Sequence, residues 1–336
     1  MAKKNKFKIS EKSKKNLSLA IRIFISIALF SVLIALNYQY LRDIPDILKD
    51  SSLIFVFLGI LFYFLGIACE APRWKILLSS HNIKIPLSYL FNSVFIGFFF
   101  GTLLPTSVGG DAYRGVDLHR SYKVPLNENI SSIYMGRFLG LLSGIFCLIV
   151  SFLFGMYKYL NKYFLIGFLI ILPIIFLMIF ITIFPKKFKI DVLFEKIKFL
   201  SRFSKNITSF SDVLEGYKLR KKELIFSFLL SILGNICTFI SFYFIGLSLK
   251  VNLGFISYMF IIPIMWTAAN IPITLGGFGV RENTLVLLLR EFNVPQNISF
   301  TFSLIVLITN ILISVFGGIV YVLTTLVSKR KKVIDA

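Results

Sequence analysis

The chain has 336 residues, of which 57% are hydrophobic, 16% aromatic and only 16% charged, and its mean hydropathy is +0.82. Soluble domains carry about a quarter charged residues, so this composition excludes an ordinary water-soluble fold and indicates an integral membrane protein. The formal net charge of +21 would suggest nucleic-acid binding in a soluble protein. Here the basic residues gather in tails and loops between apolar blocks, so no nucleic-acid partner is expected.

Six apolar blocks are long enough, with their flanks, to cross a bilayer as helices. The first follows a basic tail, and because no small-x-small cleavage site follows it, we predict an uncleaved span at about 17–37. The second, about 51–72, ends at Arg73 and Trp74, a pair suited to a cytoplasmic interface. The remaining spans are predicted at about 131–156, 163–184, 223–247 and 299–327.

Two further apolar segments, 86–104 and 253–296, are interrupted by Gly-rich breaks. If the first one spanned, the basic stretch after it would lie outside, so we predict that it re-enters and returns to the cytoplasm. By the same logic the second dips in from the outside. With this topology 29 of the 37 Lys and Arg residues lie in cytoplasmic stretches and seven in external loops. Both termini and the basic loop 185–222 are therefore predicted to be cytoplasmic, in a multi-pass protein of the cell membrane.

The two Gly-rich breaks resemble each other. A shift of 167 residues superposes four positions, namely Pro105 on Pro272, Gly109 on Gly276, Gly110 on Gly277, and Arg114 on Arg281. The same shift brings the spans that flank each break close to their counterparts, and these counterparts run in opposite directions. We therefore predict an all-α inverted repeat with halves at about 51–156 and 218–323, within a single transmembrane domain that covers residues 1–336.

The breaks are also the predicted substrate site, because interrupted helices mark the binding site in inverted-repeat transporters. Proline cannot donate a helical hydrogen bond, and Gly-Gly permits a sharp reversal of the chain. A helix that restarts after such a break points its N–H groups and its positive end into the membrane interior, which suits a phosphate. Asp111 is placed to cap the first of these helices. The alternative is that both breaks are only packing kinks.

Charged residues at membrane depth are costly and usually functional. Arg137, about two turns into its predicted span, is expected to contact a lipid phosphate or Asp111; snorkelling to the interface is the alternative. Arg114 and Arg281 each follow a Gly-Gly pair by about one helical turn, and arginine grips phosphate through paired hydrogen bonds. Glu282 is expected to orient Arg281, to carry a proton, or to cap a half-helix.

The other polar residues suggest no chemistry. Glu70 and Arg73 lie close together on one predicted helix and are expected to anchor it at the interface. The three cysteines and two histidines form no metal-type cluster, and no catalytic triad, P-loop or dinucleotide fingerprint occurs. No catalytic residue, metal or cofactor is therefore expected, and transport would be driven by a gradient or by coupled chemistry, or would run downhill.

At these residues the sequence resembles the lysylphosphatidylglycerol synthase transmembrane-region family, also called flippase-like domain proteins, over nearly its whole length. The matching residues are Arg73-Trp74, Leu104-Pro105, Gly109-Gly110-Asp111, Arg114, Arg137 with Leu139, Pro272, and Gly276-Gly277-Phe278-Gly279-Val280-Arg281-Glu282. The resemblance implies a membrane domain that moves or handles lipids with polar head groups. It also adds Arg73, Trp74 and Gly279 to the candidate substrate-binding residues.

The best-known members of that family carry a soluble domain that transfers an aminoacyl group from tRNA to phosphatidylglycerol. This sequence contains no such segment, so aminoacyl transfer is not expected. Many relatives have an acidic residue just before the arginine that matches Arg137, and here that position is Gly136. We expect a flippase-like transporter of an anionic head group, on a phospholipid, an aminoacyl-phospholipid or a polyprenyl-phosphate-linked sugar.

Two alternatives stay open. The chain would serve as a non-catalytic membrane subunit of a lipid-modifying aminoacyltransferase or glycosyltransferase, or it would act on lipids as an enzyme itself. The second is disfavoured because the sequence offers no acid–base pair. Membrane lipids with anionic head groups are the expected partners, and a lipid-modifying enzyme and a second copy of the chain are candidate protein partners.

Overall fold

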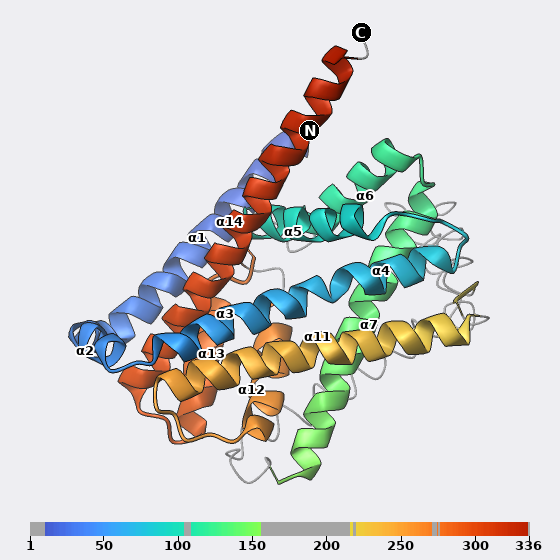
Figure 1. The fold of residues 1–336 in the computed structure, drawn as a ribbon. Helices are drawn as coiled ribbons and strands as arrows, with labels where there is room; N and C mark the ends of the chain where they lie inside the picture. The colour runs from blue at the N-terminus through green and yellow to red at the C-terminus, as the bar shows by residue number, and fades with distance from the viewer. Residues whose placement is uncertain are drawn as a thin grey trace, which may run out of the picture.

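The computed structural model describes residues 11–103, 109–155, 216–217, 220–270, 274 and 276–334. Over these residues the secondary structure is helical and contains no strand (Figure 1). Four helical stretches are long and apolar enough to cross a membrane, and they are Leu53–Ser79, Leu126–Leu153, Lys221–Ser248 and Gln296–Leu326. An all-helical, multi-pass membrane protein is therefore confirmed. The predicted span 163–184 and most of loop 185–222 lie outside the described residues.

The helices follow the same order in two halves of the chain. The two halves are preceded by an N-terminal segment that contains α1 (Glu11–Leu36), the 3-10 helix η1 (Tyr38–Arg42) and α2 (Ile44–Lys49). The first half comprises α3 (Leu53–Ala68), α4 (Glu70–Ser79), α5 (Leu87–Leu103), α6 (Gly109–Tyr122) and α7 (Leu126–Leu153). The second comprises α11 (Lys221–Ser248), α12 (Phe255–Ala269), α13 (Val280–Glu291) and α14 (Gln296–Ile334). Because α4 directly continues α3, each half reads as a long helix, two short helices and a long helix.

Two of the predicted spans have different limits in the structure. The second span does not end at residue 72, because the α3–α4 stretch runs on to Ser79 and places Arg73 and Trp74 inside it. Their polar groups find partners there: Arg73 Nη1 donates to the Ser231 hydroxyl at 3.1 Å, and the indole of Trp74 donates to Ser132 at 2.9 Å. In the first span the apolar part is only Ile23–Leu36, shorter than the four long stretches.

The long helices α3 and α11 lie side by side and run antiparallel (Figure 1). Gly59 faces Ile245, whereas Gly66, further along α3, faces Gly234, which is earlier in α11. A Cβ atom on Gly66 would lie 3.0 Å from the Gly234 carbonyl oxygen, so the absence of a side chain allows the two backbones to approach closely. The first long helices of the two halves thus point in opposite directions.

The short helices of each half form a hairpin. Helices α5 and α6 touch at Gly97 and Gly110, where a Cβ atom on Gly110 would overlap the Gly97 carbonyl oxygen. Helices α12 and α13 also pack together, and a Cβ atom on Gly277 would lie 2.9 Å from the carbonyl oxygen of Ala269. Each hairpin packs against the last long helix of the other half, because α5 contacts α14 and α12 contacts α7.

The apolar surface has the distribution expected of a protein in lipid. Large side chains such as Leu53, Ile54, Phe226 and Leu229 are exposed along α3 and α11. The main core lies instead among α3, α5, α7 and the helices of the second half, where aromatic residues such as Phe95, Phe242, Tyr258, Phe260 and Phe302 are buried. Exposed apolar side chains on long helices would be unfavourable in water and are favourable against lipid tails.

Candidate functional site

A cavity of about 1420 Å³ lies between the two halves. Its walls are mostly apolar, and every long helix of both halves contributes to them, together with α1 and all four short helices. Pockets for drug-sized ligands are typically about 300–1,000 Å³, so this cavity is large enough for a bulkier ligand. Its charged lining residues are Glu70, Arg73, Asp111, Arg114, Arg137 and Arg281.

The two hairpins approach each other at this cavity, where Gly276 lies close to the end of α5. A Cβ atom on Gly276 would lie 3.2 Å from the carbonyl oxygen of Gly101 and 3.5 Å from the Cα atom of Thr102, which are close to the end of α5. Gly276, Gly277 and Gly279 all have positive φ angles, of 53°, 78° and 83°. Residues with a side chain rarely adopt this conformation, so the second break requires glycine at these positions.

In the first hairpin the glycines serve another purpose. Gly109 and Gly110 form the first turn of α6, and the predicted reversal at these two residues is therefore wrong. Gly110 instead lets α6 approach Gly97 of α5. Asp111 also lies within the first turn of α6 rather than before it. The residues that connect the two helices, among them Pro105, lie outside the described residues, as does Pro272 in the second break.

Five charged side chains from α4, α6 and α7 form a continuous network on one side of the cavity. Asp111 pairs with Arg137 through Oδ2, and its Oδ1 lies 3.7 Å from Nη1 of Arg114. The same Nη1 lies 3.1 Å from Oε2 of Glu70, which in turn is 3.9 Å from Nη2 of Arg73. Counted over the part of the chain that the structure describes, three arginines and two carboxylates leave this network with one excess positive charge.

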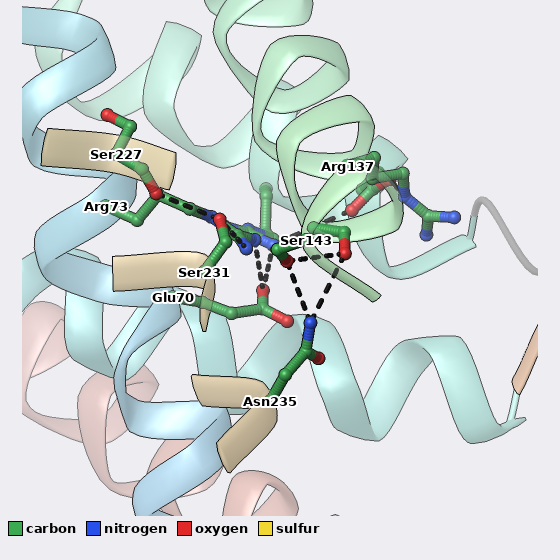
Figure 2. A network of polar contacts seen from close by, with 10 residues as sticks. Glu70, Arg73, Arg137, Ser143, Ser227, Ser231 and Asn235 are labelled. Carbon is green, nitrogen blue, oxygen red and sulfur yellow. Dashed lines mark hydrogen bonds and ion pairs between the residues drawn. The ribbon is translucent and has the colours of Figure 1, made fainter. Parts of the chain in front are cut away.

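Two arginines of this network, Arg73 and Arg114, also contact neutral groups. Figure 2 shows Arg73 extending from α4 to the Ser231 hydroxyl of α11. The guanidinium carbon of Arg114 lies 4.3 Å from the centre of the Trp74 ring, a cation–π contact. Both Arg73 and Arg114 nevertheless keep a buried Nε without a hydrogen-bond partner. Donor capacity therefore remains unused in both guanidinium groups.

Helix α7 makes room for Arg73 through a row of glycines. A Cβ atom on Gly136 would lie 3.6 Å from Nε of Arg73, and one on Gly140 would lie 3.2 Å from its Nη1. One turn further, Gly144 faces Asn235, whose side-chain amide donates to Ser143 at 2.8 Å (Figure 2). Because the spacing is four residues, these glycines lie on one face of the helix.

A second charged pair belongs to the other hairpin. Glu282 Oε1 accepts hydrogen bonds from Nε and Nη2 of Arg281, at 2.9 and 2.5 Å. Its Oε2 accepts one from the Gly279 N–H at 2.7 Å, which caps the first turn of α13. Glu282 thus performs two of the expected roles, because it orients Arg281 and caps the helix. Arg281 reaches the cavity, and its guanidinium lies 5.8 Å from the centre of the Trp266 ring.

The structure brings most of the predicted site residues to the cavity. Those that line it are Arg73, Trp74, Gly110, Asp111, Arg114, Arg137, Gly276 and Arg281. Four predicted residues that the structure describes do not line the cavity: Gly109, Gly277, Gly279 and Glu282. The glycines belong to the backbone of the hairpins, and Glu282 holds the side chain of Arg281. Glu70 and Arg73, which were expected to anchor a helix at the interface, both line the cavity.

Several lining residues were missed by sequence reasoning. Ser231 and Asn235 come from α11, far along the chain from Arg73 and Ser143, and no local pattern joins them. The four-residue spacing of the α7 glycines was visible in the sequence and would have indicated a close contact. A buried hydrogen bond from Tyr63 to Asn310, at 2.8 Å, joins α3 to α14 at the cavity wall and was also missed.

The fold and this site define a helical membrane protein with an arginine-rich internal cavity between two Gly-broken hairpins. Residues 19–318 match the model of the lysylphosphatidylglycerol synthase TM region family, and because the match covers most of the chain, the chain belongs to that family. The resemblance found in the sequence is thereby confirmed. No curated protein matches the sequence.

Proposed function

We propose that the chain is a flippase-like lipid transporter that binds an anionic head group in the cavity and carries it between the leaflets. The lipid is a phospholipid, an aminoacyl-phospholipid or a polyprenyl-phosphate-linked sugar. The observation that carries the proposal is the network of Arg73, Arg114 and Arg137 with its excess positive charge, exposed to a large apolar cavity. Such a cavity accepts lipid tails, and arginines at membrane depth are suited to a phosphate.

The arrangement of the two halves supports transport. We propose that they form an inverted repeat, since the helix order recurs, the equivalent helices α3 and α11 are antiparallel, and each hairpin packs on the other half. The hairpins would then be re-entrant from opposite faces, beside six full spans, in one domain with both termini in the cytoplasm. A site between two inverted halves is open to either side when the halves rock against each other.

Lipids retained during purification test the head-group site. Native mass spectrometry of the wild type is expected to show a bound anionic lipid, which should be lost when Arg73 and Arg114 are both replaced by Ala. Arg120→Ala is the matched control, because Arg120 is an exposed arginine on the same helix as Arg114 and does not line the cavity. Equal retention of anionic lipid by the wild type and the double variant would contradict the site.

The family description favours one further candidate, because it names the membrane region of a synthase. In this reading the chain is a non-catalytic subunit that presents lipid to an aminoacyltransferase or a glycosyltransferase. Affinity purification from native membranes separates the two functions. A stoichiometric lipid-modifying enzyme, together with no lipid exchange by the purified chain alone, would favour the subunit.

A further inference from the structure

The two carboxylates of the cavity network are not equivalent. Asp111 has only 12% of its side chain exposed and is held by Arg137 and Arg114. Glu70 has 37% of its side chain exposed and lines the cavity. A single oxygen of Glu70, Oε2, makes the contacts to both Arg114 and Arg73, whose side chains are only 10% and 12% exposed. Glu70 is thus the accessible anion between two buried cations.

A phosphate would satisfy more of the hydrogen-bond donors of Arg114 and Arg73 than the Glu70 carboxylate does. The carboxylate makes one short contact with Arg114 and only a long one with Arg73, and donor groups of both arginines stay unused. The phosphodiester of a lipid head group has two non-bridging oxygens, as a carboxylate does, and two ester oxygens besides, and its non-bridging oxygens accept paired hydrogen bonds from guanidinium groups. Without any anion between them, the two like charges would repel each other, so this position requires an anion in every state.

We propose that Glu70 is an internal counter-anion, which holds Arg114 and Arg73 together in the lipid-free protein and which the phosphate of a lipid head group displaces from Arg114. This inference rests on the proposed function. After displacement Glu70 keeps a partner, because Arg73 lies three residues further along the same helix. The carboxylate is ion-paired in both states, so the exchange is readily reversed and the lipid is released again.

A counter-anion affects lipid binding and transport in opposite directions, because it changes the net charge of the network. With Glu70 ionised the network carries one excess positive charge, which a phosphodiester neutralises. A neutral glutamine at this position removes the competitor and raises the excess to two, so the head group binds more tightly. The same change removes the anion that replaces the departing lipid, so transport slows. A purely structural role for Glu70 would instead lower both binding and transport.

Calorimetric titration of the detergent-solubilised full chain with dioctanoyl phosphatidylglycerol tests the inference, with lipid exchange measured in liposomes in parallel. Glu70→Gln is expected to lower the Kd about tenfold, within the usual range of coupling between competing groups, and to slow exchange. Glu70→Asp, whose carboxylate is one methylene shorter, should tighten binding less. Glu223→Gln makes the same charge change at the start of α11, outside the cavity lining, and should keep the wild-type Kd.

An unchanged or higher Kd for Glu70→Gln would overturn the counter-anion. If that variant does not fold, Glu70→Asp decides, because an unchanged or higher Kd for it contradicts the inference equally. A wild-type chain that binds no phosphatidylglycerol would remove the proposed function and this inference with it. If the wild type binds phosphatidylglycerol and the Glu70→Gln variant binds it with the same Kd, the counter-anion role is contradicted while the proposed function stands.

Discussion

Gly110→Ala is expected to destabilise the protein by about 3 kcal/mol or more, the upper end of what overpacking costs. The added methyl group would overlap the Gly97 carbonyl oxygen, a backbone atom that cannot rotate away. Helices α5 and α6 would have to separate, and Asp111 and Arg114, which follow on α6, would move with it. Thermal unfolding in detergent should show the loss of stability, and calorimetry the loss of anionic lipid binding.

Gly115→Ala is the matched control on the same helix. Among the described residues, a Cβ atom there meets only the end of the Ile133 side chain, at 3.9 Å, so the methyl group fits without movement. Its effect should stay within about 1 kcal/mol, and in the stabilising direction, because alanine favours helix over glycine. Equal unfolding temperatures for the two variants would show that α5 and α6 do not touch at Gly110.

Arg281→Met is expected to cost about 3–5 kcal/mol, because it leaves the Glu282 carboxylate buried without its charge partner. Only 5% of Arg281 and 1% of Glu282 are exposed, so water cannot replace the lost ion pair. Thermal unfolding of the purified variant measures this cost. Transport should fall as well, because Arg281 belongs to the cavity lining.

The double variant Arg281→Met, Glu282→Gln separates stability from function. It removes both charges, and the glutamine amide oxygen still accepts the Gly279 N–H that caps α13. Most of the stability should therefore return, whereas transport should stay low. If the double variant were no more stable than Arg281→Met, the buried ion pair would not account for the cost of the single change.

The sequence predicts the architecture well where one physical constraint dominates. The length of the apolar blocks in the sequence located the four long helical stretches, because the thickness of a bilayer fixes the length of a spanning helix. The matched breaks marked the positions of both hairpins, but for different reasons. In the second break glycines such as Gly276 adopt a positive φ, whereas Gly110 lies in the first turn of α6 and allows the close approach to Gly97. The end of the second span was predicted too early, because Arg73 and Trp74 resemble interface residues. Their place within the helical stretch depends on contacts with Ser231 and Ser132 of other helices, which the sequence does not report.

The candidate site was predictable in its arginines and in two of their partners, because Asp111 was expected near Arg137 and Glu282 near Arg281. The partners on more distant helices were not predictable. Arg114, Arg137 and Arg281 are conspicuous because charge at membrane depth is costly, so each was found from its position alone. The role of Glu70 depends on Arg114, which lies on another helix, and no periodicity of the sequence reports that contact. The same holds for Ser231 and Asn235, since neutral polar residues are common in transmembrane helices.

Lipid exchange by the purified chain in liposomes tests the central claim most directly. A fluorescent phosphatidylglycerol, whose outer-leaflet pool is bleached chemically, reports movement between leaflets. With the wild type, exchange of this lipid should be faster than in protein-free liposomes, and faster than exchange of a matching fluorescent phosphatidylcholine. The variant with Arg114, Arg137 and Arg281 all replaced by Ala should not accelerate exchange. Wild-type exchange that persists in the triple variant would contradict the site, and a wild type no faster than empty liposomes would contradict transport itself.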